Sequence, residues 1–157
     1  GNLLINMGPE PSGKMPFEQE RRFRELGLWM FVNGEAIHNI RPCPVSGEGN
    51  VRFTRSKEDP SVVYVIIPQG KKHWKRGERR ELTLKSLAMD GPTSISVLGQ
   101  NDQVVEYQPR KKPVSRVEQT QDGLKLSVVR AQRLYNDHKW PNLIVVKLAG
   151  VKFVAGE

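Results

Sequence analysis

The stretch VRFTRSKEDPSVVYVIIP, residues 51–68, contains two short runs of β-branched and aromatic residues, 51–55 and 62–67, with turn-forming polar residues between them. Short runs bounded by turn residues are typical of β-strands. Six to eight short strands in this arrangement predict a mainly β fold, a Greek-key-like antiparallel β-sandwich. The further runs, with no helical repeat between them, lie at 81–87, 94–98, 104–107, 114–117, 124–129 and 143–149.

Ahead of these runs lies the one segment with a convincing helical pattern, residues 17–32. Phe23, Leu26 and Met30 recur at helical spacing, which predicts a single apolar face. The pair Asn33-Gly34 follows, and an Asn or Gly in the left-handed conformation is a common helix stop. We therefore expect a helix over 17–32 that ends at Asn33-Gly34.

The chain opens with the apolar run NLLINM, residues 2–7, followed by a turn rich in Gly and Pro. A continuous apolar run is expected of a strand buried on both faces of a parallel sheet. Strand, loop and helix would form a first unit over 1–42, and the β-rich remainder a second over 43–157. We place the boundary at Arg41-Pro42-Cys43-Pro44 because two prolines favour an extended connector.

Composition narrows the class of protein without identifying it. Hydrophobic residues make up 37% and charged residues 27%, which is typical of a folded chain. The net charge of +8 would attract phosphate, acidic glycans or anionic lipid, but it says little about chemistry. No run approaches the ~18 apolar residues of a membrane span, and we expect any targeting signal to lie outside this chain.

Metal and cofactor sites are not expected. Cys43 is the single cysteine, so the chain has no disulfide framework and no thiolate zinc site. His38, His73 and His138 are scattered, without acidic companions at metal-ligand spacing. Phosphate-binding glycine loops are absent as well.

Residues 1–42 carry several motifs in a fixed order. The motifs are Gly1-Asn2-Leu3-Leu4, Asn6, Gly8-Pro9, Pro16, Glu18, Arg22-Phe23-Arg24-Glu25, Gly27, Trp29 and Asn33-Gly34-Glu35-Ala36-Ile37. Together they strongly resemble the end of the catalytic domain in α-L-fucosidases of glycoside hydrolase family 29. The runs at 51–55 and 62–67 also resemble the first sandwich strands of that family, and weaker similarity continues through 84–98 and 123–148.

This resemblance implies that the chain is the C-terminal part of a longer fucosidase, comprising the last strand and helix of a (β/α)8-like barrel and a sandwich that supports it. Family members are retaining hydrolases, in which an aspartate attacks the anomeric carbon and a second carboxyl group acts as acid and base. In the family both precede the segment that opens this chain, so no catalytic residue is carried over. We predict that the chain alone is inactive.

The resemblance also implies partners and a location. The partners would be the upstream catalytic barrel and, through the parent enzyme, a fucosylated glycan. The location would be extracellular, periplasmic or lysosomal. No cofactor is implied, and nothing in the sequence indicates the oligomeric state.

Asn6 is the one position with a plausible share in an active site. It falls at the C-terminal end of the predicted opening strand, and barrel active sites lie at that face. The alternative is that Asn6 caps a turn by bonding nearby backbone. Glu10, Glu18 and Glu35 could be considered as a carboxylate pair, but Glu18 fits a first-turn helix charge and the other two fall in turns, so we do not expect them to be catalytic.

The segment KKHWKRGERR, residues 71–80, interleaves cations with Trp74. Such a pattern can funnel and stack single-stranded nucleic acid, although we favour a solvated hairpin tip because charge runs are usually exposed loops. Arg110-Lys111-Lys112 has the same character. A surface formed by both segments would be more suggestive, but the sequence does not show whether they meet.

Trp140 precedes Pro141 near the last predicted strand. It is either a glycan contact at the sandwich edge or a buried aromatic at the strand entry, and the second is favoured because aromatics contribute large core area. Two further functions therefore stay open beside the fucosidase part. One is a non-catalytic carbohydrate-binding accessory sandwich, and the other, which is disfavoured, is nucleic-acid binding through residues 71–80.

Overall fold

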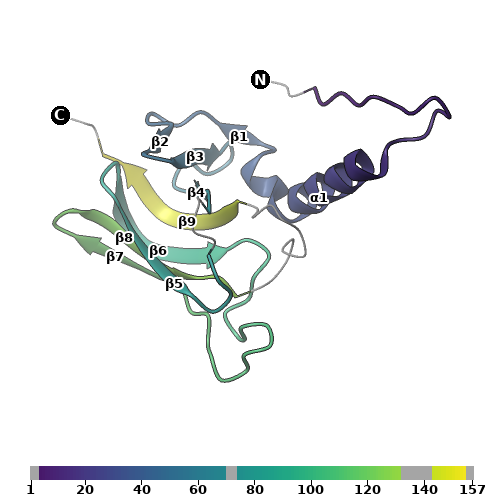
Figure 1. Ribbon diagram of the computed structural model, residues 1–157. Helices are drawn as coiled ribbons and strands as arrows, with labels where there is room; N and C mark the ends of the chain where they lie inside the picture. The colour runs from purple at the N-terminus through teal and green to yellow at the C-terminus, as the bar shows by residue number, and fades with distance from the viewer. Residues whose placement is uncertain (1–3, 70–73, 132–142, 155–157) are drawn as a thin grey trace.

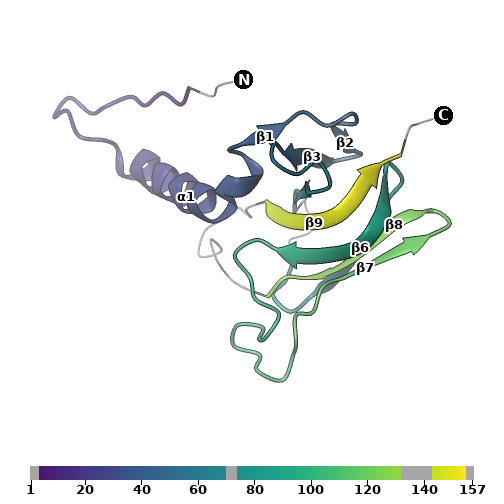
Figure 2. The same ribbon diagram turned by 180° about the vertical axis from the view of Figure 1, so that it is seen from behind.

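The computed structural model describes residues 4–69, 74–131 and 143–154. It shows two antiparallel β-sheets packed face to face, with one α-helix projecting from the side of the larger sheet (Figures 1 and 2). The fold class expected from the sequence, an antiparallel sandwich preceded by a helix, is confirmed.

The larger sheet has six strands. Its order is β1-β3-β4-β9-β6, with β2 pairing to β3 off this path, and all neighbours are antiparallel. The strands are β1 (Ile40–Arg41), β2 (Gly47–Glu48), β3 (Val51–Ser56), β4 (Val63–Ile67), β6 (Leu87–Val97) and β9 (Ile144–Phe153).

The smaller sheet covers one face of the larger one. It contains β5 (Arg79–Leu84), β8 (Gly123–Val129) and β7 (Arg116–Thr120), with β8 in the middle. Along β8, Leu124, Leu126 and Val128 are fully buried and alternate with partly exposed residues, as expected for a strand with one face on the core. The core between the sheets is therefore formed by every second residue of the facing strands.

Strand β4 is buried on both faces, unlike the edge strands. Val63 and Val65 point into the core between the sheets, whereas Tyr64 belongs to a second apolar cluster on the other side of the larger sheet. That second cluster includes Trp29 of helix α1 (Phe17–Asn33). β4 thus contributes both to the sandwich core and to the apolar cluster that packs against Trp29 of the helix, which we call the seat of α1.

The helix begins and ends where the sequence predicts, but it lacks the expected left-handed stop. Gly34 lies in the right-handed region, with φ −57°, and the chain continues into a 3-10 turn, η1 (Gly34–Ala36). The left-handed residue comes later, at Asn39, with φ 53°. The α-helix therefore ends at Asn33, as expected, but without a left-handed residue at that point. Asn33 itself is buried and donates its side-chain amide to the Trp29 carbonyl, at 2.9 Å.

Three of the predicted strands need correction. Residues 104–107 form an irregular loop, in which Val105 bridges Gln108. The strand expected at 114–117 begins only at Arg116, and the run 81–87 is divided because β5 ends at Leu84 and β6 begins at Leu87.

The Asp90-Gly91-Pro92 sequence lies inside β6 rather than between strands. It forms a bulge opposite Gly150, where the pairing of β6 with β9 shifts register. Gly150 has φ +77°, and a Cβ there would stand 2.2 Å from the Pro92 carbonyl oxygen. A turn-type sequence therefore bends a long strand, as bulges do.

The opening strand expected at 2–7 is absent from the described residues of that run. Residues 4–10 have no strand pairing, and the Leu4 side chain is 92% exposed. A parallel strand needs neighbouring strands to satisfy its backbone groups. No neighbouring strand is supplied to residues 4–10 by the described part of this chain.

Glu48 links the two sheets through a carboxylate. Its side chain accepts hydrogen bonds from the backbone of Lys85, at 2.9 Å, and from the backbone and hydroxyl of Ser86. Lys85 and Ser86 form the connection between β5 of the smaller sheet and β6 of the larger. Burial raises the pKa of Glu48, but these hydrogen bonds from Ser86 and Lys85 outweigh it and leave the pKa below its usual value.

Replacing Glu48 by Gln should destabilise the fold by about 1–3 kcal/mol, because an amide nitrogen would face a backbone donor. A depressed carboxyl pKa contributes stability above the unfolded pKa of 4.5 and loses it as the pH falls through the folded pKa. Urea unfolding from pH 7 to pH 3 should therefore show a shallower acid loss in Glu48→Gln than in wild type. The exposed Glu118→Gln is the matched control, and an equal effect in both variants would contradict the linking role of Glu48.

Candidate functional site

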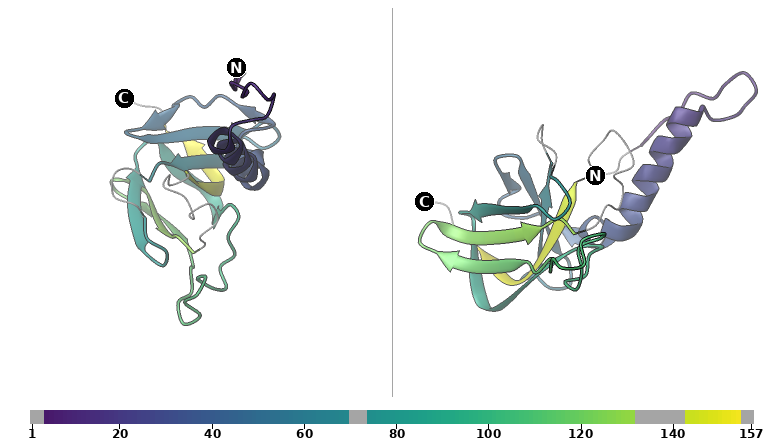
Figure 3. Two further views of the ribbon diagram at one scale, coloured as in Figure 1. Left: turned by 45° about the vertical axis from the view of Figure 1, so that its right-hand side comes forward. Right: turned by 60° about the horizontal axis from the view of Figure 1, so that its bottom comes forward.

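Helix α1 is fixed to the sandwich at its C-terminal end. The Trp29 indole N–H donates to the Leu143 carbonyl at 2.9 Å, and Trp29 packs in the cluster that holds Ala36, Tyr64 and Val145. Trp29 and Asn33 are the buried residues of the helix. The rest of α1 extends away from the sandwich (Figure 3).

The helix also exposes large apolar side chains along its length. Phe17 is 73% exposed, Leu28 48% and Phe31 87%. Their spacings of 11 and 14 residues correspond to nearly whole turns, so the three lie on one face. We call Phe17, Leu28 and Phe31 the outer helix face. The charged pair Glu20 and Arg24 lies between Phe17 and Leu28 along the helix. Large apolar side chains exposed on one side of a helix are consistent with an interaction site.

Asn6 lies in the segment before the helix and is exposed. Its side-chain oxygen accepts a hydrogen bond from the backbone of its neighbour Met7, at 2.9 Å. The loop that follows is held to the helix by Gln19, which accepts from the Gly8 backbone at 3.2 Å. In this chain the contact of Asn6 is thus the local backbone bond expected of a capping asparagine, and its place near a substrate stays a prediction.

A polar hollow of about 540 Å³ lies where the helix end meets the sandwich. Glu35 is one of its lining residues: it accepts a hydrogen bond from the Tyr64 hydroxyl at 3.1 Å and pairs with Lys147 at 2.7 Å. The Lys147 ammonium also lies 5.9 Å from the centre of the Tyr64 ring. His38 and Glu58 contribute to the lining.

This hollow offers hydrogen-bonding groups but no aromatic stacking surface. Tyr64 is only 4% exposed, and its pKa is raised to about 12 by burial, by the Glu35 charge and by the hydrogen bond it donates to Glu35. The phenol is therefore a hydrogen-bond donor at neutral pH. Sequence reasoning missed this group because its members are 29 and 83 residues apart in the chain.

The three carboxylates considered from the sequence each have a hydrogen-bond or ion-pair partner. Glu18 pairs with Arg21 at 3.2 Å, one turn along the helix. Glu10 lies 3.5 Å from the Ser12 hydroxyl, and Glu35 is held in the hollow described above. None of these contacts joins two carboxyl groups across a space for a sugar, which retaining chemistry requires.

Several sequence candidates fall outside the described residues. Trp140, His73 and His138 are among them, and so is part of the basic segment 71–80. His38 lines the polar hollow, and no cluster of three metal-ligating side chains occurs in the parts of the chain that are described. Within the same parts, no helix is long and apolar enough to cross a bilayer.

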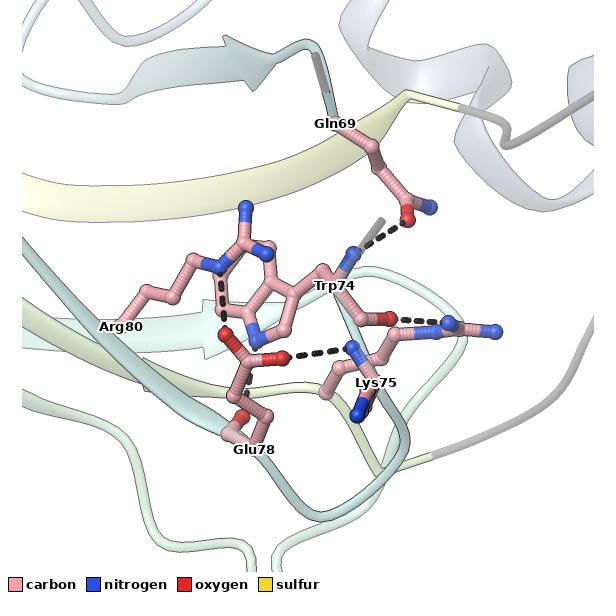
Figure 4. A network of polar contacts seen from close by, with 6 residues as sticks. Gln69, Trp74, Lys75, Glu78 and Arg80 are labelled. Carbon is pink, nitrogen blue, oxygen red and sulfur yellow. Dashed lines mark hydrogen bonds and ion pairs between the residues drawn. The ribbon is translucent and has the colours of Figure 1, made fainter. Parts of the chain in front are cut away.

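Trp74 is the described aromatic of the basic segment, and it is fully buried. Its indole N–H donates to the Glu78 carbonyl at 2.8 Å, its backbone N–H donates to Gln69 at 3.2 Å, and the Arg80 guanidinium lies 5.2 Å from its ring (Figure 4). Trp74 therefore belongs to the core. It does not present a face on which a nucleic-acid base could stack.

Two solved structures with a similar fold are fucosidases. A bacterial fucosidase crystallised with an inhibitor aligns with 99% of this chain and 29% of its own, with a TM-score of 0.54 and 19% identity. A family 29 α-L-fucosidase from Bacteroides thetaiotaomicron aligns with 96% of this chain and 29% of its own, with a TM-score of 0.51 and 19% identity. The sandwich and its helix thus have the fold of part of these glycoside hydrolases.

Sequence comparisons identify the same family. The α-L-fucosidase family model matches residues 1–35. Human tissue α-L-fucosidase is 36% identical over 100 residues, which are 63% of this chain and 20% of that protein. Human plasma α-L-fucosidase is 50% identical over 70 residues, 43% of this chain and 15% of that protein.

The chain is a relative of the α-L-fucosidases of glycoside hydrolase family 29, as its motifs indicated. Its matches span about a fifth of the length of the curated relatives, which is consistent with a C-terminal part of such a protein. The matched family segment, 1–35, covers the projecting helix and the outer helix face.

The raised pKa of Tyr64 has a measurable consequence for stability. A group whose folded pKa exceeds its unfolded value of 10.0 contributes stability below pH 10 and loses it as the pH rises toward about 12. Tyr64→Phe should therefore show a smaller loss of unfolding free energy between pH 9 and pH 11.5 than wild type. Tyr107→Phe, at a 71% exposed position, should behave as wild type, and identical alkaline profiles for all three proteins would contradict the assignment.

Proposed function

We propose that this chain is the C-terminal portion of an α-L-fucosidase-like retaining glycoside hydrolase, in which the sandwich supports the catalytic barrel and α1 joins the two. The observation that carries the proposal is the outer helix face. It lies in the segment that matches the fucosidase family model, and it has no partner among the described residues.

The energetics of α1 support a missing partner. Isolated helices of about this length are marginal in water, and α1 buries only Trp29 and Asn33. Ion pairs within the helix, such as Glu20 with Arg24 at 2.6 Å, add only a few tenths of a kcal/mol each. Burial of a phenylalanine against a second domain contributes about 1.5–3 kcal/mol, so Phe17 and Phe31 together would stabilise α1 far more than its own ion pairs do.

The exposed segment before the helix fits the same arrangement. Leu4 and Ile5 are 92% and 44% exposed, although such an apolar run suits a strand with neighbours on both sides. In the proposed parent enzyme this segment is the last strand of the barrel, over the unit 1–42. Asn6 then falls at the end of that strand, at the face where barrel active sites lie.

The chemistry follows from the same assignment. Retaining hydrolysis of a fucoside needs a nucleophilic carboxylate and an acid/base carboxyl group about 5–5.5 Å apart. The carboxylates discussed above are held by local ion pairs and hydrogen bonds, so we assign both reacting groups to the remainder of the parent enzyme. The chain's own contribution is to complete and brace the barrel, and its substrate is a fucosylated glycan bound by that barrel.

The inactive-portion proposal is tested with a chromogenic α-L-fucoside. Purified chain 1–157 should give no turnover above background, because the pair of carboxyl groups required for the reaction is not within it. A longer chain that carries this sequence after its barrel should hydrolyse the same substrate. Robust turnover by residues 1–157 alone would refute the proposal.

The supporting role is tested at Phe31, which is 87% exposed here. Phe31→Ser should change the unfolding free energy of the 157-residue chain by no more than about 0.5 kcal/mol. In the longer chain it should cost about 1.5–3 kcal/mol, because the ring would be buried against the barrel.

Tyr107→Ser is the matched control, since it removes another exposed aromatic ring from a site away from α1. It should have a small effect of the same size in both chains. If Phe31→Ser also has equal and small effects in both chains, the outer helix face does not contact the barrel.

A further inference from the structure

The two basic segments that are separate in the sequence meet in the structure. The Arg76 guanidinium lies 5.0 Å from the centre of the Tyr107 ring, and the Arg76 carbonyl accepts from the Gln108 side chain at 3.3 Å. Arg79 donates to the Val114 carbonyl at 2.9 Å. Residues 74–80 therefore pack against the loop that leads from β6 to β7, which hangs from one end of the smaller sheet (Figures 1 and 2).

We call residues 74–80 and 101–116 together the basic end surface. They contain eight cations and three carboxylates, an excess of five positive charges in a chain of net charge +8. Most of the cations are exposed, namely Lys75, Arg79, Arg110, Lys111, Lys112 and Arg116. Within the described residues none of these six forms an ion pair, and Arg79 is held by the neutral Ser127 and Val114 instead. Their charge is left for an external anion.

A buried network holds this surface in one arrangement. Arg130 is 6% exposed and donates to the Trp74 carbonyl, and its own carbonyl accepts from the Gly77 backbone at 2.7 Å. Gly77 has φ +75°, and a Cβ there would stand 2.5 Å from the Gln108 side-chain oxygen. The two segments are thus closely fitted at Gly77, so a ligand need not order them on binding.

We propose that the basic end surface binds a sulfated polysaccharide. Sulfate groups repeat along such a chain and carry a permanent negative charge. Exposed arginines offer them planar, bidentate donors and exposed lysines offer point charges. Cations contributed by two adjoining segments suit an extended polyanion better than a single small anion, because several charges must be met at once.

The aromatic side chains argue against single-stranded nucleic acid. Binding of bases requires open aromatic faces, but Trp74 is fully buried and the Tyr107 ring is faced by Arg76. The choice of a polysaccharide over other polyanions rests on the proposed function in glycan chemistry. The surface lies on the sandwich, apart from the outer helix face, so its binding is measured independently of fucoside hydrolysis.

The test uses heparin as the sulfated probe and the 157-residue chain, with affinity measured by calorimetry between 50 and 300 mM salt. Wild type should bind with an affinity that falls steeply with salt, since each contact releases counterions. The variant Arg110→Ser/Lys111→Ser/Lys112→Ser should bind about tenfold more weakly, with a salt slope smaller by roughly one unit per contact removed. Lys75→Ser, in the other segment, should also weaken binding.

The matched control is Lys14→Ser/Arg41→Ser/Lys57→Ser, which lowers the net charge by the same amount at exposed positions outside the surface. It should retain wild-type affinity; equal weakening in both triple variants would show that only overall charge matters, and would overturn the proposal. Circular dichroism and thermal unfolding confirm that each variant is folded.

Three further probes separate sulfated polysaccharide from other polyanions. Hyaluronan, which carries carboxylates but no sulfate, should bind more weakly than heparin. An oligothymidylate of matched charge and vesicles containing phosphatidylserine should bind more weakly as well. Tighter binding of any of these three, or no binding of heparin at 50 mM salt, would overturn the proposal.

Discussion

The seat of α1 on the larger sheet is the contact on which the rest of the account depends. Trp29 anchors it with one indole hydrogen bond to Leu143 and with packing against Tyr64 and Val145. Because β4 is buried on both faces, the strand that carries the sandwich core also carries this seat. The direction in which the helix leaves the sandwich is therefore fixed by the same residues that stabilise the fold.

Only the C-terminal end of α1 packs against the sandwich, so the stability of the remaining turns needs an explanation. Phe17 in the extension, and Leu28 and Phe31 beside the anchor, are exposed to solvent, while Trp29 is buried. Hydrophobic surface of this kind is stabilised by a second body, and the family match at residues 1–35 falls on the same part of the chain. Packing energetics and similarity are both consistent with the proposed arrangement, in which the helix is shared between the sandwich and a larger domain.

Much of the architecture was predictable because it depends on local sequence patterns. The β-branched and aromatic run 62–67 corresponds closely to β4, and the helix begins at Phe17 as expected. Features that depend on tertiary contacts were not predictable. One example is Asp90-Gly91-Pro92, which bends β6 because Gly150 on the opposite strand leaves room for it.

The site could be predicted less well than the fold. Two contacts join residues that are far apart in the chain: the one among Glu35, Tyr64 and Lys147, and the one between the two basic segments. No local sequence pattern predicts such contacts. Trp74 shows the converse. Its basic neighbours suggested an exposed hairpin tip, with nucleic-acid binding as the disfavoured alternative, whereas packing and the Glu78 carbonyl make Trp74 part of the core.

Amide hydrogen exchange of α1 tests the central claim most directly. In the 157-residue chain, the amides in the first half of Phe17–Asn33 should exchange rapidly, since packing protects only the end near Trp29. In a longer chain that includes the barrel, the same amides should exchange as slowly as those of β4. Equal and rapid exchange of these amides in both chains would show that α1 has no second partner.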